Sequence, residues 1–137
     1  MINIVKVNVD EHWTQASKLL KDAIELSNGR HTLESTYNNL VKGVMRLYAV
    51  YVKDKIKSFF VTQIVLYPAK TIYGIIFCGG THVINNIKKI ESFFKTEAMT
   101  NGCRGVEIIG RNGWSKIIKN TPSLEFIPKG VYYEMDT

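Results

Sequence analysis

Residues 71–111 constrain the fold of this chain more than any other segment. An apolar run at 71–78 ends in two glycines, an amphipathic stretch follows at 83–101, and a second apolar run lies at 105–109. A strand, a helix and a strand in this order predict a crossover unit, which makes the two strands parallel neighbours if they share a sheet. The ends of such strands, beside a helix N-terminus, are where α/β folds usually bind phosphate groups. The segment therefore contains a candidate binding site.

Strand and helix periodicities cover most of the remaining chain. Alternating apolar residues predict strands, and apolar residues three or four apart predict helices. In chain order the expected elements are a strand at 2–9, helices at 10–26 and 32–42, strands at 46–52, 56–66 and 71–78, a helix at 83–101, a strand at 105–109, a helix at 114–120, and a closing hairpin of strands at 123–127 and 130–135. We expect one α+β domain spanning residues 1–137, with a mixed, mostly antiparallel sheet of about seven strands and about four helices.

Local signals indicate where some of these elements begin or bend. Asp10, Thr32 and Thr81 each stand where a side chain can cap the first turn of a helix. The alternation slips at Phe59 and Phe60, which predicts a β-bulge in the second strand of the meander. These signals fix the expected boundaries of the elements before any tertiary contact is considered.

Composition narrows the class of protein. A hydrophobic content of 45% with 22% charged residues argues against disorder. No run approaches the about 18 apolar residues that cross a bilayer, and Asp10 and Glu11 come too early for a secretory signal. We therefore expect a cytoplasmic protein with no membrane partner and with reduced thiols at Cys78 and Cys103. The three histidines lack zinc-ligand spacing, so no metal is expected.

The net charge of +6 is spread along the chain. The tightest basic cluster, Lys53, Lys55 and Lys57, lies on an expected hairpin turn and has no Arg beside it. Surfaces that follow a nucleic-acid backbone need a contiguous basic stripe, often with exposed aromatic residues. We therefore expect no specific nucleic-acid binding.

The order and lengths of the elements resemble the GNAT fold of acyl-CoA-dependent N-acetyltransferases over essentially the whole chain. The resemblance is strongest to the small, divergent GNAT-like proteins of tailed bacteriophages. It is carried by four segments: Cys78-Gly79-Gly80, Gly102-Cys103-Arg104, residues 105–109, and Gly110-Arg111-Asn112-Gly113-Trp114. It implies a phage-encoded protein in the host cytoplasm or in the virion, with a phage or host protein as a possible partner. A homo-oligomer is also possible.

The resemblance implies a site for acetyl-CoA between the strands at 71–78 and 105–109. In the family, the pantetheine arm lies between these strands and the pyrophosphate lies on a glycine-rich loop at the next helix. The matching cofactor-binding residues here are Ile76, Phe77, Cys78, Gly79, Gly80, Thr81 and His82. The chain lacks the family's Gln/Arg-x-x-Gly-x-Gly/Ala spacing in this loop. Two interpretations stay open: a Gly-Gly turn that presents N–H groups to phosphate, or a tight connection between strand and helix.

Acetyl transfer to an amine needs a base for the ammonium proton and an acid for the departing thiolate. Glu107 is the candidate base, because a carboxylate on a short central strand should point into the cleft or the core. The alternative is an ion pair with Arg104, Arg111 or a lysine. The helix after that strand has no Tyr, so Tyr132 is the candidate acid, although strand tyrosines commonly serve packing.

Arg111 and Trp114 are candidate substrate-binding residues. The guanidinium of Arg111 could contact an acidic substrate or a phosphate, and Trp114 could line the same site. Alternatively, Trp114 packs the short helix into the core.

The sequence leaves two functions open. One is an N-acetyltransferase that transfers the acetyl group directly from acetyl-CoA to an amine. The other is a non-catalytic GNAT-fold phage protein that acts as a virion or assembly component or binds a host factor.

Overall fold

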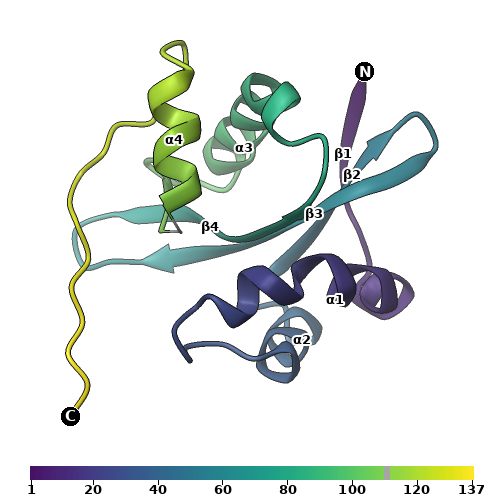
Figure 1. Ribbon diagram of the computed structural model, residues 1–137, viewed down its shortest axis with the longest axis horizontal. Helices are drawn as coiled ribbons and strands as arrows, with labels where there is room; N and C mark the ends of the chain where they lie inside the picture. The colour runs from purple at the N-terminus through teal and green to yellow at the C-terminus, as the bar shows by residue number, and fades with distance from the viewer. Residues whose placement is uncertain (110–111) are drawn as a thin grey trace.

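The computed structural model describes residues 1–109 and 112–137, which form one mixed sheet with helices on both faces (Figure 1). In chain order the elements are β1 (Ile2–Lys6), α1 (Val9–Glu25), α2 (Leu33–Val41), β2 (Arg46–Val52), β3 (Lys55–Leu66), β4 (Thr71–Gly80), the 3-10 helix η1 (Ile84–Asn86), α3 (Ile87–Thr100), β5 (Val106–Ile108) and α4 (Asn112–Asn120). The strand order is β1-β2-β3-β4-β5, antiparallel except for the parallel pair of β4 with β5. The predicted crossover unit is therefore confirmed.

Two hydrophobic clusters lie on the two faces of the sheet. The helices α1 and α2 cover one face, and α3 covers the other, with α4 beside it (Figure 1). Along β4, Tyr73 and Ile75 face the α3 side, where Phe94 packs against them. Phe77 faces the α1–α2 side instead, because an extra residue at Ile76 shifts the alternation. Burial on both faces explains why the central strands are apolar almost throughout.

A β-bulge in β4 sets the shape of the sheet at its β5 edge. In the pairing of β3 with β4, Val61 faces Phe77 and Thr62 faces Ile75, so Ile76 is an extra residue on β4. The pairing of β4 with β5 ends at Ile75 opposite Ile108, immediately before this residue. A bulge bends its strand and increases its twist. Beyond Ile75, β4 therefore continues to Gly80 with no strand of the described chain beside it on that edge.

The expected sheet of about seven strands is wrong, because the described residues form five. Residues 121–137 contain neither of the two strands predicted at 123–127 and 130–135. Their apolar side chains largely face solvent, with Val131 77% and Tyr133 86% exposed. An isolated hairpin is only marginally stable in water. β5 has just three residues with which such a hairpin could pair. Alternation alone therefore did not suffice to form strands here.

Several expected local features differ in detail. Asn8, not Asp10, caps α1: the Asn8 side-chain oxygen accepts the Asp10 N–H at 2.8 Å. Thr32 caps α2 in a reciprocal capping box with Ser35, as predicted for Thr32. Thr81 caps no helix, because neither η1 nor α3 has a side-chain cap.

The predicted bulge at Phe59 and Phe60 is also displaced. The extra residue on β3 is Lys57, opposite the step from Val50 to Tyr51. Phe59 and Phe60 are themselves regularly paired and fully buried on opposite faces of the sheet. The slip in alternation therefore reflects a strand that is apolar on both sides.

Two further expectations concerned the thiols of the two cysteines and the absence of a membrane-crossing segment. Cys78 and Cys103 form no disulfide bond with each other in the structure. Within the part of the chain that the structure describes, no helix combines the length and apolar character that a membrane crossing requires.

Gly79 is a position at which β4 tolerates no side chain. A Cβ there would lie 1.9 Å from the Leu19 carbonyl oxygen of α1. We expect Gly79→Ala to destabilise the protein by about 2 kcal/mol or more, because α1 must move off β4. Urea unfolding measures this, and Gly130→Ala, where nothing lies within 4 Å of the added Cβ, is the control. Equal midpoints for both variants would contradict the close contact.

Candidate functional site

A cavity of about 460 Å³ opens where β4 and β5 part. Its walls come from the end of α1 and the following loop, from β4, β5 and α4, and from the C-terminal segment. Six residues that the sequence singled out line it: Ile76, Phe77, Cys78, Glu107, Trp114 and Tyr132. The structure thus brings together candidate residues from four separate parts of the chain.

Strand geometry explains why Glu107 lies in this cavity. Val106 and Ile108 pack in the cluster on the α3 side, so Glu107 between them points to the α1–α2 side. Ile76 faces that same side, and the bulge turns Phe77 there as well, since both pack with the α1–α2 cluster. Two apolar side chains of β4 and one carboxylate of β5 consequently form the floor of the cavity.

The carboxylate of Glu107 has a partner that the sequence did not indicate. The Tyr67 hydroxyl, in the turn between β3 and β4, donates a hydrogen bond of 2.7 Å to Glu107 Oε2. This bond is the main reason that the pKa of Tyr67 is raised, with burial second. Among the described residues Glu107 forms no ion pair, so the alternative partners Arg104 and lysine are not observed. Arg111, the third alternative, lies outside the described residues.

The loop between α1 and α2 adds Arg30 and His31 to the cavity, and sequence reasoning missed both. The turn at Asn28-Gly29, with φ of 57° and 77°, directs the chain back toward β4. The His31 ring then meets the Phe77 ring edge-on, with centroids 5.2 Å apart. Burial, with the Arg30 charge second, lowers the pKa of His31 below its usual 6.5, so the imidazole is neutral at pH 7. The Asn-Gly pair shortly after the helix predicted at 10–26 was the available signal.

The C-terminal segment reaches the cavity through Tyr132. Arg30 donates hydrogen bonds to the Tyr132 hydroxyl and to the Glu134 carboxylate. The Arg30 guanidinium carbon lies 4.7 Å from the centroid of the Tyr132 ring, a cation–π contact. The Tyr132 hydroxyl in turn donates to Glu134 Oε1 at 3.1 Å. These contacts hold a segment without secondary structure against the α1–α2 loop.

Gly79, Gly80, Thr81 and His82 do not line the cavity. Gly79 packs against the α1 backbone, and Gly80 has a φ of 119° and would clash with the Lys57 carbonyl if it carried a Cβ. The Thr81 N–H donates to that same carbonyl at 2.8 Å. This geometry favours the tight connection between strand and helix. A role of these four residues in cofactor binding stays a prediction.

The structure describes only one of the two candidate substrate-binding residues. Trp114, half-buried on α4, lines the cavity. Arg111 lies outside the described residues, so its expected contact with substrate is untested.

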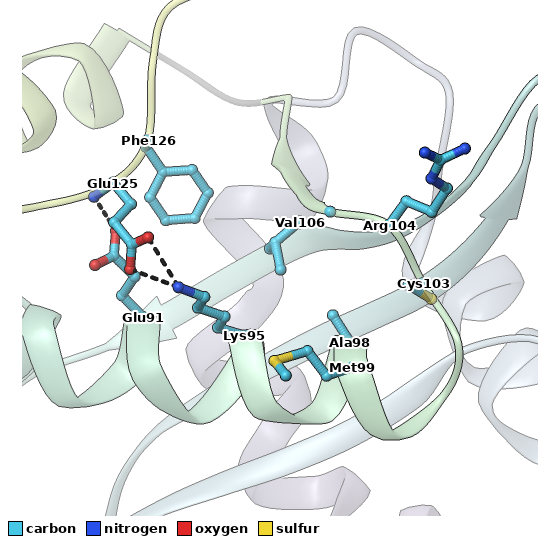
Figure 2. A pocket seen from close by; sticks show the side chains of 10 residues that line it. Glu91, Lys95, Ala98, Met99, Cys103, Arg104, Val106, Glu125 and Phe126 are labelled. Atoms are coloured by element: carbon cyan, nitrogen blue, oxygen red, sulfur yellow. Dashed lines mark hydrogen bonds and ion pairs between the residues drawn. The ribbon is translucent and has the colours of Figure 1, made fainter.

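A second cavity of about 230 Å³ lies between α3 and the chain around β5 (Figure 2). Glu91, only 6% exposed, accepts the Glu125 N–H at 2.8 Å. Figure 2 shows Lys95 and Glu125 pointing toward each other, with Nζ–O distances of 2.9 and 3.1 Å. The ammonium of Lys95 is the main reason that the pKa of Glu125 is lowered. The contacts fasten the start of the C-terminal segment to α3, so we assign this place a structural role.

No protein-family model and no curated protein sequence matches the chain. Solved structures do match over almost the whole length of both chains. A protein described as a transcriptional regulator from Bacillus halodurans C-125 has a TM-score of 0.71 at 13% identity, covering 100% of each chain. Ribosomal-protein-alanine N-acetyltransferase from Brucella melitensis biovar Abortus 2308 has a TM-score of 0.71 at 10% identity, covering 99% of each.

A predicted acetyltransferase from Clostridium acetobutylicum, solved with acetyl-CoA, has a TM-score of 0.70 at 11% identity. The match covers 99% of this chain and 96% of that one. The chain therefore has the GNAT fold, as the order of its elements predicted. The proposed origin from a phage stays a prediction.

The lowered pKa of His31 gives a prediction for pH. Because the folded state binds fewer protons than the unfolded state below pH 6.5, the contribution of His31 to stability declines as the pH falls through that value. We expect the imidazole to titrate below 6.5 in an NMR titration, and Arg30→Gln to raise the pKa only part of the way, since burial remains. Lys21→Gln on the exposed side of α1 is the control. Titration of His31 at or above 6.5 would contradict the assignment.

Proposed function

We propose that this chain is an N-acetyltransferase of the GNAT type, which transfers an acetyl group from acetyl-CoA directly to an amine. One observation carries the proposal: β4 and β5 run parallel as far as Ile75 and Ile108, then part at the Ile76 bulge. The opening leads into the cavity that contains the Glu107 carboxylate. A slot for a chain-like cofactor and a base for an amine therefore adjoin each other.

The slot suits the pantetheine arm of acetyl-CoA. Beyond Ile75, β4 has no neighbouring strand of the described chain on the β5 side, so an extended amide chain could lie along Ile76 and Phe77. Ile76, Phe77 and Cys78 would hold this arm. The N–H groups that begin α3 have no side-chain cap, which suits an anionic pyrophosphate near Thr81 and His82. Bound acetyl-CoA supplies an activated acetyl group as a thioester.

Two side chains of the cavity provide proton transfer. Glu107 accepts the proton of the substrate ammonium, which leaves the amine free to attack a carbonyl carbon. The Tyr67 hydroxyl holds the Glu107 carboxylate in place through its hydrogen bond. Tyr132, whose ring lies at the cavity, is our candidate for returning a proton to the leaving thiolate. Trp114 and, as an untested prediction, Arg111 contact the acceptor.

A second candidate is a GNAT-fold protein that binds a partner without acetyl transfer, for instance a virion component or a host-factor-binding protein of a phage. The glycine pair at Gly79 and Gly80 favours it, because the α1 backbone and the Lys57 carbonyl occupy the space around these glycines. The contact of Glu134 with Arg30 at the cavity also favours it, because a side chain of the chain itself takes up a charged group there.

An acetyl-CoA titration of the purified protein separates the two candidates. A ligand that binds only the folded state stabilises it by about 2.7 kcal/mol at one hundred times Kd, which appears as a rise in Tm. We expect such a rise with acetyl-CoA and a smaller one with adenosine 3′,5′-bisphosphate, which lacks the pantetheine arm. No rise at millimolar acetyl-CoA would reject the enzyme and leave the binding protein.

Replacing Glu107 tests the base. We expect Glu107→Gln to lower kcat/KM by about 100-fold or more, since the amide cannot take a proton but still accepts the Tyr67 hydrogen bond. Release of the CoA thiol with a panel of small primary amines measures the rate. Glu25→Gln, on the exposed end of α1, is the matched control and should leave the rate unchanged. If Glu107→Gln transfers acetyl groups at the normal rate, the assignment of the base is wrong.

A further inference from the structure

The cavity contains opposite charges in an otherwise mostly apolar lining. Glu107 contributes a carboxylate from β5, and Arg30 contributes a guanidinium from the loop after α1. Ile76, Phe77 and Trp114 supply apolar and aromatic parts of the lining. His31, the other titratable group of the loop, has a lowered pKa and adds no charge at pH 7. A ligand that matches this lining carries an ammonium, an anion and an apolar body.

The structure also displays which anion Arg30 accepts. The Glu134 carboxylate, from a segment without helix or strand, pairs with Arg30 Nη2. The Tyr132 ring stacks on the same guanidinium at 4.7 Å. The pair is exchangeable, because the Arg30 and Glu134 side chains remain 41% and 39% exposed, and ion pairs of this kind add little net stability. A carboxylate from a ligand can therefore take the place of Glu134.

We propose that Arg30 binds the carboxylate of the acceptor, which is an amino acid with an apolar or aromatic side chain, and that Glu134 occupies this position in the free protein. The proposal rests on the proposed acetyl transfer and specifies its substrate class. The acceptor ammonium lies toward Glu107, its carboxylate replaces that of Glu134 at Arg30, and its side chain contacts the apolar wall. Arg30 suits this role because its planar fork binds carboxylates with two hydrogen bonds.

Calorimetric titration of the full chain with three matched ligands tests the charge pattern. The ligands are L-phenylalanine, 2-phenylethylamine, which lacks the carboxylate, and 3-phenylpropanoate, which lacks the amine. We expect L-phenylalanine to bind about tenfold or more tightly than either of the others, since each of them leaves one charged group of the cavity without its partner. L-leucine and L-methionine extend the test to other apolar side chains.

Two variants assign the effect to Arg30. Arg30→Gln should weaken L-phenylalanine by about tenfold and leave 2-phenylethylamine unchanged. Glu134→Gln should tighten L-phenylalanine by about two- to fivefold, because it removes the competing carboxylate. Glu134 lies in a segment without secondary structure, so this variant does not endanger the fold. Lys21→Gln, which breaks an exposed ion pair with Glu25 on α1, is the control and should change nothing.

The possible outcomes separate this inference from the function on which it rests. If acetyl-CoA binds but L-phenylalanine, L-leucine and L-methionine all fail to bind, in the unaltered chain and in Glu134→Gln, the inference is wrong and the proposed acetyltransferase function stands. Equal affinities for L-phenylalanine and 2-phenylethylamine would also overturn it. Amino-acid binding without acetyl-CoA binding would refute the proposed function and, with it, the acceptor role. A preference for L-phenylalanine over both analogues that is lost in Arg30→Gln and strengthened in Glu134→Gln would establish the inference.

Discussion

The extra residue at Ile76 is the feature on which the site depends. A regular β4 would continue to pair with its parallel neighbour, and the sheet would remain closed at this edge. With one additional residue in β4, the pairing ends at Ile75 and both Ile76 and Phe77 face α1 and α2. The same residue thus opens the slot and supplies part of its wall. The cost is small, because a bulge sacrifices one regular pair and keeps the remainder of the ladder.

Periodicity predicted those parts of the fold in which burial has a regular pattern. The strand at 46–52 was expected at its observed bounds, and the parallel pair around the 83–101 helix followed from element order alone. The place of Glu107 was also foreseeable, since a lone carboxylate between two apolar strand residues must point to the opposite face. Such arguments succeed where a residue's neighbours along the chain decide its direction.

The features that were missed depend on contacts between distant segments. Arg30 and His31 reach the cavity only because the Asn28-Gly29 turn returns the chain to β4, and Tyr67 meets Glu107 across 40 residues. The alternation of apolar and polar residues along a strand does not indicate such contacts between distant segments. The closing hairpin failed for the opposite reason: residues 130–135 alternate as a strand would, yet alternation does not create a partner. Local pattern gives a segment's preference, and tertiary contact decides whether it is realised.

The C-terminal segment is fastened at two places on opposite faces of the sheet. Glu125 is bound on the α3 side, and Tyr132 with Glu134 on the side of the α1–α2 loop. β5 is the last strand of the sheet, and the C-terminal segment reaches its surroundings on both faces: Phe126 lines the cavity that includes Val106, and Tyr132 lines the cavity that includes Glu107. Unpaired borders invite strands of other molecules and lead to aggregation. A C-terminal segment held on both faces beside β5 would stand in the way of a strand from another molecule, although it contributes no strand of its own.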